Sequence, residues 1–206
     1  MAARHAITSA GLNKFTQDTF YLVDIEHQKA PVPVTCMGFA KSETGAFLVG
    51  SEHGSIYQVN RFDSALLKSG IDANIVYNGH NSVVTSIDFH RSHSDFQDLF
   101  LTSSFDWTVN LWRKGNHATK PLVSLEHYQD YVYDIKWAPK HPAMFATADG
   151  LGALEIHNLT RSDTLVERHV MPNNKPLNKL AWHDNHIACG SLDGTIFLHQ
   201  VEKVIW

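Results

Sequence analysis

A thirteen-residue pattern that occurs four times without a gap constrains the fold of this chain more than any other feature. The copies are FLVGSEHGSIYQV (47–59), FLTSSFDWTVNLW (100–112), FATADGLGALEIH (145–157) and IACGSLDGTIFLH (187–199). Each has an apolar first residue, a small or acidic fifth residue, a turn at the seventh and eighth positions and an apolar tenth residue. Each copy therefore predicts a strand, a tight turn and a second strand.

Another β-rich run precedes every hairpin, as in VVTSIDFH (83–90) and YVYDIKWAP (131–139). The hairpins begin at residues 47, 100, 145 and 187, and most of this spacing is close to the ~40 to 45 residues of a WD-repeat propeller blade. An immunoglobulin-like sandwich also has many short strands, but it does not repeat one hairpin in register. The prediction is an all-β WD-repeat β-propeller with about four blades, at roughly 30–60, 79–113, 127–159 and 176–200.

These blades fill residues 30–206, and residues 1–29 form an N-terminal segment. Within that segment TFYLVDIEHQ (19–28) is a candidate for the last strand of a preceding blade. Because WD-repeat propellers usually close with about seven blades, we expect an incomplete propeller with open sheet faces. Such faces predict poor solubility or self-association.

Composition excludes several classes of function. The 206 residues are 43% apolar and 18% charged, with a formal charge of −4, and no run of like charges suggests a nucleic acid partner. No segment resembles a signal peptide or a membrane span, which predicts a cytoplasmic protein without membrane contact. The two cysteines lie in apolar runs and form no CxxC motif, as expected for reduced thiols.

Fourteen histidines invite a metal hypothesis. Two pairs are closely spaced, His90 with His93 and His183 with His186, but neither has a cysteine pair or second histidine cluster nearby to complete four ligands. The chain also has no glycine-rich loop of the kind that holds phosphate. We therefore expect neither a metal nor a cofactor.

Four polar residues of the second repeat have matching hydrogen-bonding capacities. The Trp112 indole can only donate, the Ser104 hydroxyl and neutral His80 can both donate and accept, and the Asp106 carboxylate can only accept. We predict a structural tetrad in which Trp112 donates to Ser104, Ser104 to His80, and His80 to Asp106. Such a chain would lock the hairpin to the loop that precedes the blade. In the third repeat Asp149 and His157 replace the serine and the tryptophan, and His127 falls one position from the aligned place.

The alternative for the same residues is a hydrolase whose nucleophile triad is Ser104, His80 and Asp106. Ser104 does not lie in a GxSxG motif, and no glycine-rich stretch nearby suggests an oxyanion hole. We therefore expect no catalytic residues and a protein that is not an enzyme.

Aromatic residues also occur where turns are expected. Phe105 and Trp107 lie in the second hairpin turn, and Tyr131 and Tyr133 lie near the start of the third blade. In a propeller the hairpin turn and the loop before the first strand of a blade share one face, which would bring Phe105, Trp107 and Tyr131 together. These side chains either pack on a neighbouring blade or contact a partner.

The sequence LFLTSSFDWTVNLW (99–112), followed by the run from KPLVSL to LEIHNL (120–159), resembles the C-terminal WD-repeat region of cytoplasmic dynein intermediate chains. The resemblance extends over roughly residues 30–200. It implies a noncatalytic scaffold subunit of the dynein motor complex that binds the dynein heavy chain. It also implies a cytoplasmic, microtubule-associated location and a role in microtubule-based transport.

Members of this family have a long N-terminal segment that binds the light chains and dynactin, followed by earlier blades. We expect both parts to be missing from this chain, so light-chain and dynactin binding are assigned to none of its residues. A WD-repeat adaptor of another assembly remains an alternative, because the fold alone does not determine the partner.

Overall fold

The computed structural model describes residues 31–41, 45–60, 70–91, 94–115 and 120–201. Within these ranges the strands form four antiparallel sheets, which we call blades 1 to 4. Blade 1 contains β1 (Val34–Phe39), β2 (Ala46–Ser51), β3 (Ile56–Asn60) and β4 (Gly70–Tyr77). Blade 2 contains β5 (Val84–Phe89), β6 (Leu99–Ser104), β7 (Val109–Arg113) and β8 (Val123–Leu125). Blade 3 contains β9 (Val132–Trp137), β10 (Met144–Asp149), β11 (Ala153–Asn158) and β12 (Leu165–Val170). Blade 4 contains β13 (Leu177–His183), β14 (His186–Ser191) and β15 (Ile196–Gln200).

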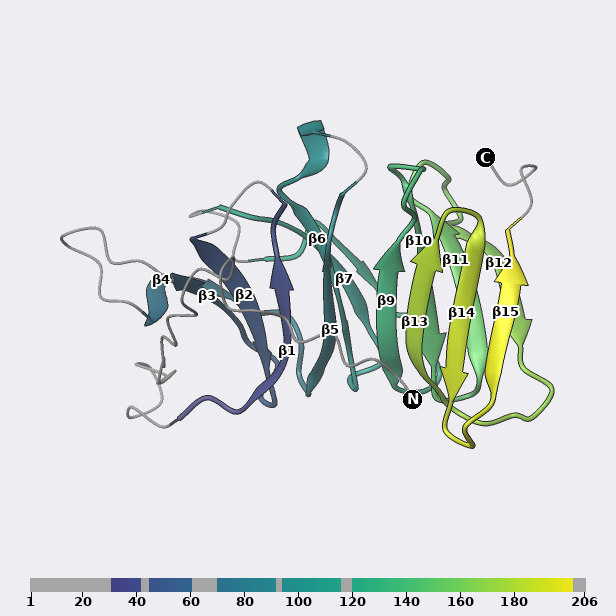
Figure 1. The fold of residues 1–206 in the computed structure, drawn as a ribbon. Helices are drawn as coiled ribbons and strands as arrows, with labels where there is room; N and C mark the ends of the chain where they lie inside the picture. Colours follow the sequence, from purple (N-terminus) through teal and green to yellow (C-terminus); the bar gives the residue numbers. More distant parts are fainter. Residues whose placement is uncertain (1–30, 42–44, 61–69, 92–93, 116–119, 202–206) are drawn as a thin grey trace, which may run out of the picture.

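The blades stand side by side in chain order and form an open arc (Figure 1). Their first strands, β1, β5, β9 and β13, pack against one another in that order. A short 3-10 helix, Ser94–Phe96, is the helical element of the described residues. None of the helices in these ranges is long and apolar enough to cross a membrane. The predicted all-β, incomplete propeller is confirmed.

The blade limits expected from the sequence cover the first three strands of each blade. The outer strands β4, β8 and β12 lie beyond those limits. Two of them give weak sequence signals, because β8 has three residues and β12 has no buried residue. Residues 1–29, with the candidate strand at 19–28, lie outside the described residues.

The apolar core lies between the blades. Ile56 of β3 packs with Ile87 and Phe89 of β5, and Leu154 of β11 packs with Leu180 of β13. Between blades 2 and 3, Leu101 of β6 packs in one cluster with Ile135 of β9. The faces of neighbouring blades therefore pack on each other, and the main contacts join the first and second strands of one blade to the first strand of the next. Burying one such side chain contributes roughly 1.5 to 3 kcal/mol.

Threonine hydroxyls add polar contacts between the first strands of neighbouring blades. Thr35 Oγ1 of β1 donates to the Val84 carbonyl of β5 at 2.6 Å. Thr85 Oγ1 of β5 donates to the Val132 carbonyl of β9, also at 2.6 Å. Each threonine is the second residue of the first strand of its blade. The same position in the repeat therefore makes the same contact between blades.

Two buried carboxylates make a second kind of contact between blades. Asp88 of β5 accepts a hydrogen bond from Trp137 N of β9 at 2.8 Å. Asp134 of β9 accepts one from Leu180 N of β13 at 2.9 Å and one from Ser86 Oγ at 2.6 Å. Because each carboxylate bonds to a backbone amide of the following blade, the spacing and register of the first strands are defined along the arc.

Candidate functional site

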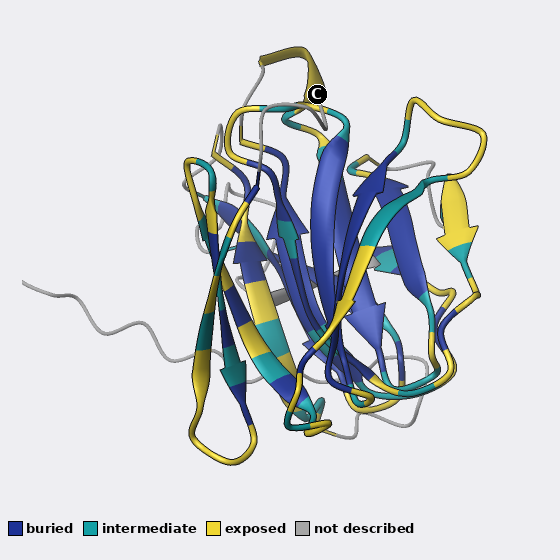
Figure 2. Ribbon diagram, turned by 90° about the vertical axis from the view of Figure 1, so that its right-hand side faces the viewer, coloured by how far each residue is buried: buried dark blue, intermediate teal, exposed yellow. Residues whose placement is uncertain are grey.

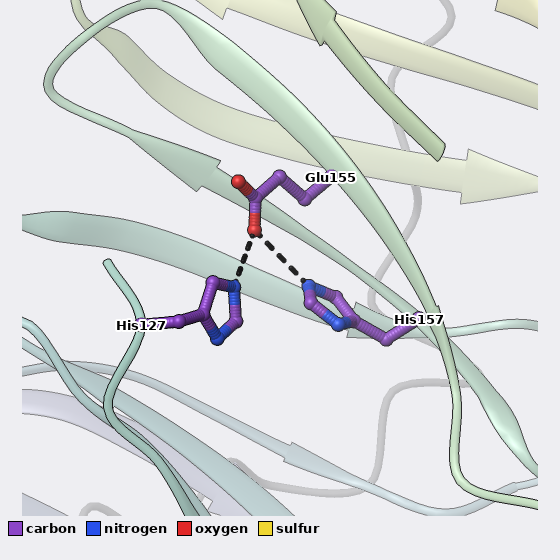
Figure 3. Close-up of side chains that lie close together, drawn as sticks. All are labelled: His127, Glu155 and His157. Atoms are coloured by element: carbon purple, nitrogen blue, oxygen red, sulfur yellow. Dashed lines mark hydrogen bonds and ion pairs between the residues drawn. The ribbon is translucent and has the colours of Figure 1, made fainter. Parts of the chain in front are cut away.

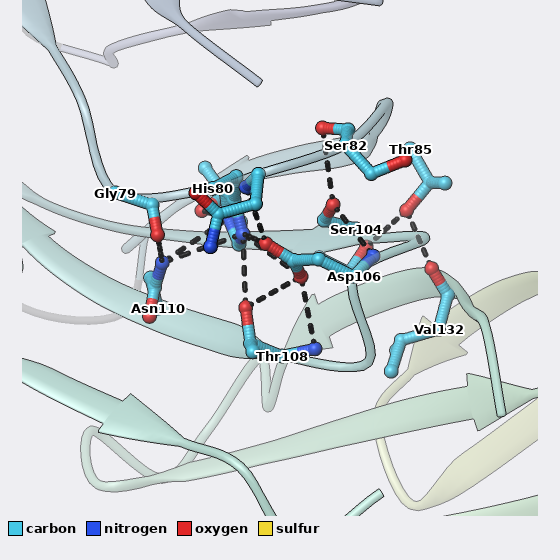
Figure 4. A network of polar contacts seen from close by, with 12 residues as sticks. Gly79, His80, Ser82, Thr85, Ser104, Asp106, Thr108, Asn110 and Val132 are labelled. Carbon is cyan, nitrogen blue, oxygen red and sulfur yellow. Dashed lines mark hydrogen bonds and ion pairs between the residues drawn. The ribbon is translucent and has the colours of Figure 1, made fainter. Parts of the chain in front are cut away.

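A hydrogen-bonded chain crosses the interior of blade 2. Trp112 Nε1 donates to Thr102 Oγ1 at 2.8 Å, and Thr102 Oγ1 lies 2.7 Å from His80 Nε2. His80 Nδ1 lies 3.1 Å from Asp106 Oδ2 (Figure 4). Since Trp112 can only donate and the carboxylate can only accept, the consistent assignment has Thr102 donating to Nε2 and Nδ1–H donating to Asp106. Trp112 and Thr102 are fully buried, and His80 nearly so.

Ser104 does not occupy the position that the sequence predicted between Trp112 and His80. Its hydroxyl donates to the Ser82 carbonyl at 3.2 Å and accepts from Asp106 N at 3.1 Å. The reason is register: Phe100 of β6 lies opposite Trp112, so the next residue on the same face is Thr102, and Ser104 lies a further two residues away at the strand end. The predicted tetrad thus retains three of its members.

The same geometry removes the basis for a nucleophile triad. The ring nitrogens of His80 contact Thr102, Asp106, Thr108 and Asn110, whereas the Ser104 hydroxyl contacts Ser82 and the Asp106 amide. A serine nucleophile needs its base within hydrogen-bond reach, and the described contacts of Ser104 do not include the His80 ring.

Asp106 anchors the turn between β6 and β7. Its carboxylate accepts from Asn81 N at 2.8 Å, from Thr108 N at 3.1 Å and from Thr108 Oγ1 at 2.7 Å (Figure 4). Burial raises the pKa of Asp106, but hydrogen bonds from His80, Thr108 and Asn81 outweigh burial and bring the pKa to about 2. The anionic carboxylate therefore fixes the hairpin turn against the loop that precedes β5.

Blade 3 has a different set of residues at the equivalent positions. Tyr128 precedes Val132 by four residues, as His80 precedes Val84, and its hydroxyl donates to Thr147 Oγ1 at 3.2 Å. The same hydroxyl lies 3.1 Å from Nε2 of His157, which stands at the repeat position of Trp112. Alignment on the first strand would have identified Tyr128, which the sequence analysis missed.

His127, Glu155 and His157 form a compact cluster beside that hydroxyl (Figure 3). Glu155 Oε2 lies 2.9 Å from His127 Nε2 and 3.3 Å from His157 Nε2, and Oε1 lies 3.1 Å from Arg168 Nε. Burial raises the pKa of Glu155, but hydrogen bonds from both histidines outweigh it and lower the pKa to about 2. Burial also lowers the pKa of His157, so this imidazole is mainly neutral near pH 7.

Two imidazole nitrogens and a carboxylate oxygen are a donor set that zinc accepts. In this structure, however, both oxygens of Glu155 already have a partner, with Arg168 on one side and the histidines on the other.

This cluster contains none of the four closely spaced histidines that the sequence offered as metal ligands. His90 is buried with Nε2 at 3.0 Å from the Pro142 carbonyl, His183 and His186 are exposed, and His93 lies outside the described residues.

We use the name aromatic surface for four residues near the β6–β7 turn and the start of β9: Phe105, Trp107, Tyr131 and Tyr133. The Phe105 ring, from the β6–β7 turn, lies 4.6 Å from the Tyr131 ring and 5.3 Å from the Tyr133 ring, measured between centroids. The structure thus brings these three residues together across blades 2 and 3. Trp107 is in the same turn and is 48% exposed, with no ring contact to the other three in the described part of the chain.

Trp107 also has an uncommon backbone conformation. Its φ is 68°, in the left-handed region that a bulky side chain rarely adopts. The same repeat position is glycine in the other three hairpins, at Gly54 (φ 92°), Gly152 (φ 79°) and Gly194 (φ 85°). A side chain other than glycine costs about 1 to 2 kcal/mol in this conformation. Blade 2 therefore carries an exposed tryptophan where the fold favours glycine.

Comparison with known proteins identifies the repeats and a relative. The family described as "WD domain, G-beta repeat" matches residues 73–113. The cytoplasmic dynein 1 intermediate chain of Drosophila melanogaster is 36% identical over 192 residues, which cover 91% of this chain. The chain is a WD-repeat protein related to dynein intermediate chains. It spans only 28% of the length of that relative.

Two designed proteins of known structure share the fold of this WD-repeat chain. The crystal structure of the computationally designed Ika4 protein superposes with a TM-score of 0.66 at 20% identity, covering 91% of this chain and 99% of Ika4. The computationally designed Ika8 protein gives a TM-score of 0.64, also at 20% identity, and the match covers 85% of this chain but 47% of Ika8. At this identity the likeness concerns the fold alone.

The first prediction tests the position of Thr102 in the hydrogen-bonded chain. Replacing Thr102 with Val keeps the shape of the side chain but leaves Trp112 Nε1 and His80 Nε2 without their buried partner. We expect the free energy of unfolding to fall by roughly 1 to 3 kcal/mol. Thr102→Ser, which keeps the hydroxyl, is the matched control and should lose less. Urea unfolding of both variants measures the difference, and equal stability of the two would contradict the assignment.

The second prediction concerns pH. In the unfolded chain Glu155 titrates near its ordinary value of 4.5, whereas in the folded chain its pKa is about 2. Its contribution to stability is therefore complete above the unfolded value and is lost as the pH falls toward 2. Urea unfolding between pH 7 and pH 3 should show a shallower acid dependence for Glu155→Gln than for the wild type. Identical slopes would mean that the carboxylate does not have the depressed pKa.

Proposed function

We propose that this chain is a noncatalytic scaffold of the cytoplasmic dynein motor complex, in which its blades bind the dynein heavy chain and support microtubule-based transport. The relation to a dynein intermediate chain over 91% of the chain supports this role. The proposal places the protein in the cytoplasm, on the microtubule cytoskeleton. Light chains and dynactin, which bind other parts of such proteins, are assigned to none of its residues.

The strained and exposed Trp107 is the observation that carries the proposal for a contact residue. At this turn position a side chain adds strain, and among the residues that the structure describes no ring packs on Trp107 to offset it. A bulky residue in a disfavoured backbone conformation suggests a role outside folding. Tryptophan is also among the residue types that contribute most to binding when a partner buries it.

The other aromatic residues divide between packing and contact. Phe105 and Tyr133 are half-buried and meet edge to face between blades 2 and 3, so their main role is to join the two blades. Tyr131 is 44% exposed, and its contact with Phe105 extends this packing to the surface. We infer that Trp107 and Tyr131 contact the heavy chain, and that Phe105 and Tyr133 hold the platform beneath them.

An adaptor role in another assembly is the remaining alternative, since a WD-repeat fold serves many partners. Capture of the dynein heavy-chain tail by the wild-type chain separates the two roles. Binding supports the dynein scaffold, whereas a folded chain that captures no heavy chain would overturn it.

The third prediction separates binding from folding by using Trp107→Gly. Glycine adopts the observed φ without strain, so the thermal midpoint should stay unchanged or rise. Loss of the indole should weaken capture of the heavy-chain tail by at least tenfold, the size expected for a binding hot spot. Leu151→Ala is the matched control, because Leu151 is 38% exposed in the equivalent turn of blade 3 and should not affect binding. Normal binding by Trp107→Gly would exclude the aromatic surface while leaving the scaffold proposal intact.

A further inference from the structure

The cluster of His127, Glu155 and His157 in blade 3 is built from side chains that can all ligate a metal ion. One ligand atom of each residue lies within 4.8 Å of the other two (Figure 3). In the part of the chain that the structure describes, this is the group of three histidine, cysteine or acidic side chains that comes this close together. The scaffold role proposed above makes no use of it.

The fold gives the cluster a buried side and an open side. Glu155 and His157 lie two residues apart on β11, so their side chains project from the same face of the strand. All six residues of β11 are buried, as are most residues on the strands in the middle of the molecule (Figure 2). His127 comes from the segment between β8 and β9, and its side chain is 39% exposed. Two ligands therefore lie on a buried strand, and solvent reaches the third.

The distances within the cluster are close to those of a tetrahedral zinc site. Bonds of about 2.0 to 2.2 Å from zinc to nitrogen and oxygen hold the ligand atoms roughly 3.3 to 3.6 Å apart. Oε2 of Glu155 lies 2.9 Å from Nε2 of His127 and 3.3 Å from Nε2 of His157. An ion between the three atoms therefore needs shifts of only a few tenths of an ångström along these two distances.

The existing partners of Glu155 are compatible with an ion. The groups on Oε2 are the two histidines themselves, so a metal ion replaces these hydrogen bonds and does not compete with a third residue. Oε1 keeps its contact with Arg168, and an outer contact of this kind orients a ligating carboxylate. The nearby Tyr128 hydroxyl donates to Thr147 Oγ1, so it does not need the imidazole lone pair of His157.

His157 can release its Nε2 lone pair without losing a hydrogen bond at its other nitrogen. Nδ1 is buried and has no hydrogen-bond partner among the described residues. While Nε2 carries the proton, Nδ1 is a bare acceptor; when Nε2 binds an ion, the proton moves to Nδ1, which is unpartnered in both states. Burial also lowers the pKa of His157, which favours the neutral imidazole that a metal ion requires.

We propose that His127, Glu155 and His157 bind one zinc ion, with a water molecule in the fourth position. Two imidazoles and one carboxylate with an open fourth position are a known zinc ligand set. The ion joins the segment before β9 to β11. It thereby makes in blade 3 the kind of link that the hydrogen-bonded chain makes in blade 2, between the loop before the first strand and the interior of the blade.

The experiment titrates the 206-residue chain, purified without a histidine tag, with Zn²⁺ in competition with a fluorescent zinc indicator. We expect one equivalent to bind near neutral pH and to raise the thermal midpoint. His127→Gln should weaken binding by at least about tenfold and remove the rise. His169→Gln is the matched control, because His169 is an exposed histidine 2.6 Å from the carboxylate of Glu167 and lies outside the cluster.

His127 is partly exposed, so His127→Gln should remain folded, and circular dichroism checks this. Glu155→Gln, which keeps the shape of the side chain, is a second variant that should weaken Zn²⁺ binding in the same way. Co²⁺ in place of Zn²⁺ reports the geometry, because four-coordinate Co²⁺ absorbs visible light much more strongly than six-coordinate Co²⁺.

The wild type should give the strong four-coordinate Co²⁺ spectrum, and both cluster variants should lose it. Absence of saturable Zn²⁺ binding would overturn the proposal. Equal affinities of the wild type and the cluster variants would also overturn it, since the ion would then bind elsewhere, and so would a weak six-coordinate Co²⁺ spectrum. All of these measurements use the chain alone, so they are independent of heavy-chain binding.

Discussion

The packing of each blade on the first strand of the next is the interaction on which the rest of the structure depends. A single antiparallel sheet of three or four strands cannot bury both of its faces, and here the core lies between sheets. Buried carboxylates and threonine hydroxyls add directional contacts to this apolar packing, as Asp88 does with Trp137 N and Thr85 with the Val132 carbonyl. The arc is therefore a series of similar interfaces between neighbouring blades.

Within blade 2 this framework determines where the candidate contact residue lies. The chain from Trp112 through Thr102 and His80 to Asp106 joins the interior of the blade to its hairpin turn. Because Asp106 fixes that turn through four donor groups, the neighbouring Trp107 is held in a left-handed conformation that its own side chain disfavours. A buried polar network thus supports a strained residue at the surface. This relation connects the stability of the blade with its proposed binding role.

The sequence predicted the hairpins well because their alternating apolar positions and turn residues are local signals. It placed Ser104 in the hydrogen-bonded chain, where the structure has Thr102, because counting donors and acceptors gives no information about which residues share a face across two strands. It could not indicate the cluster of His127, Glu155 and His157, since these contacts depend on how a loop folds back over β11. The outer strand β12 was missed for a different reason: its residues are not buried, so it lacks an apolar pattern.

The aromatic residues show the limit of reasoning from sequence most clearly. The sequence indicated that Phe105, Trp107 and Tyr131 would share a face, but packing and exposure distinguish their roles only in the folded chain.

The most direct test of the proposed contact between Trp107 and the heavy chain is photo-crosslinking. A benzophenone amino acid is placed at position 107, or at position 151 as the reference, and each protein is irradiated with the dynein heavy-chain tail. The account predicts a heavy-chain crosslink from position 107 and none from position 151. Crosslinks from position 151 alone, or equally from both positions, would contradict it.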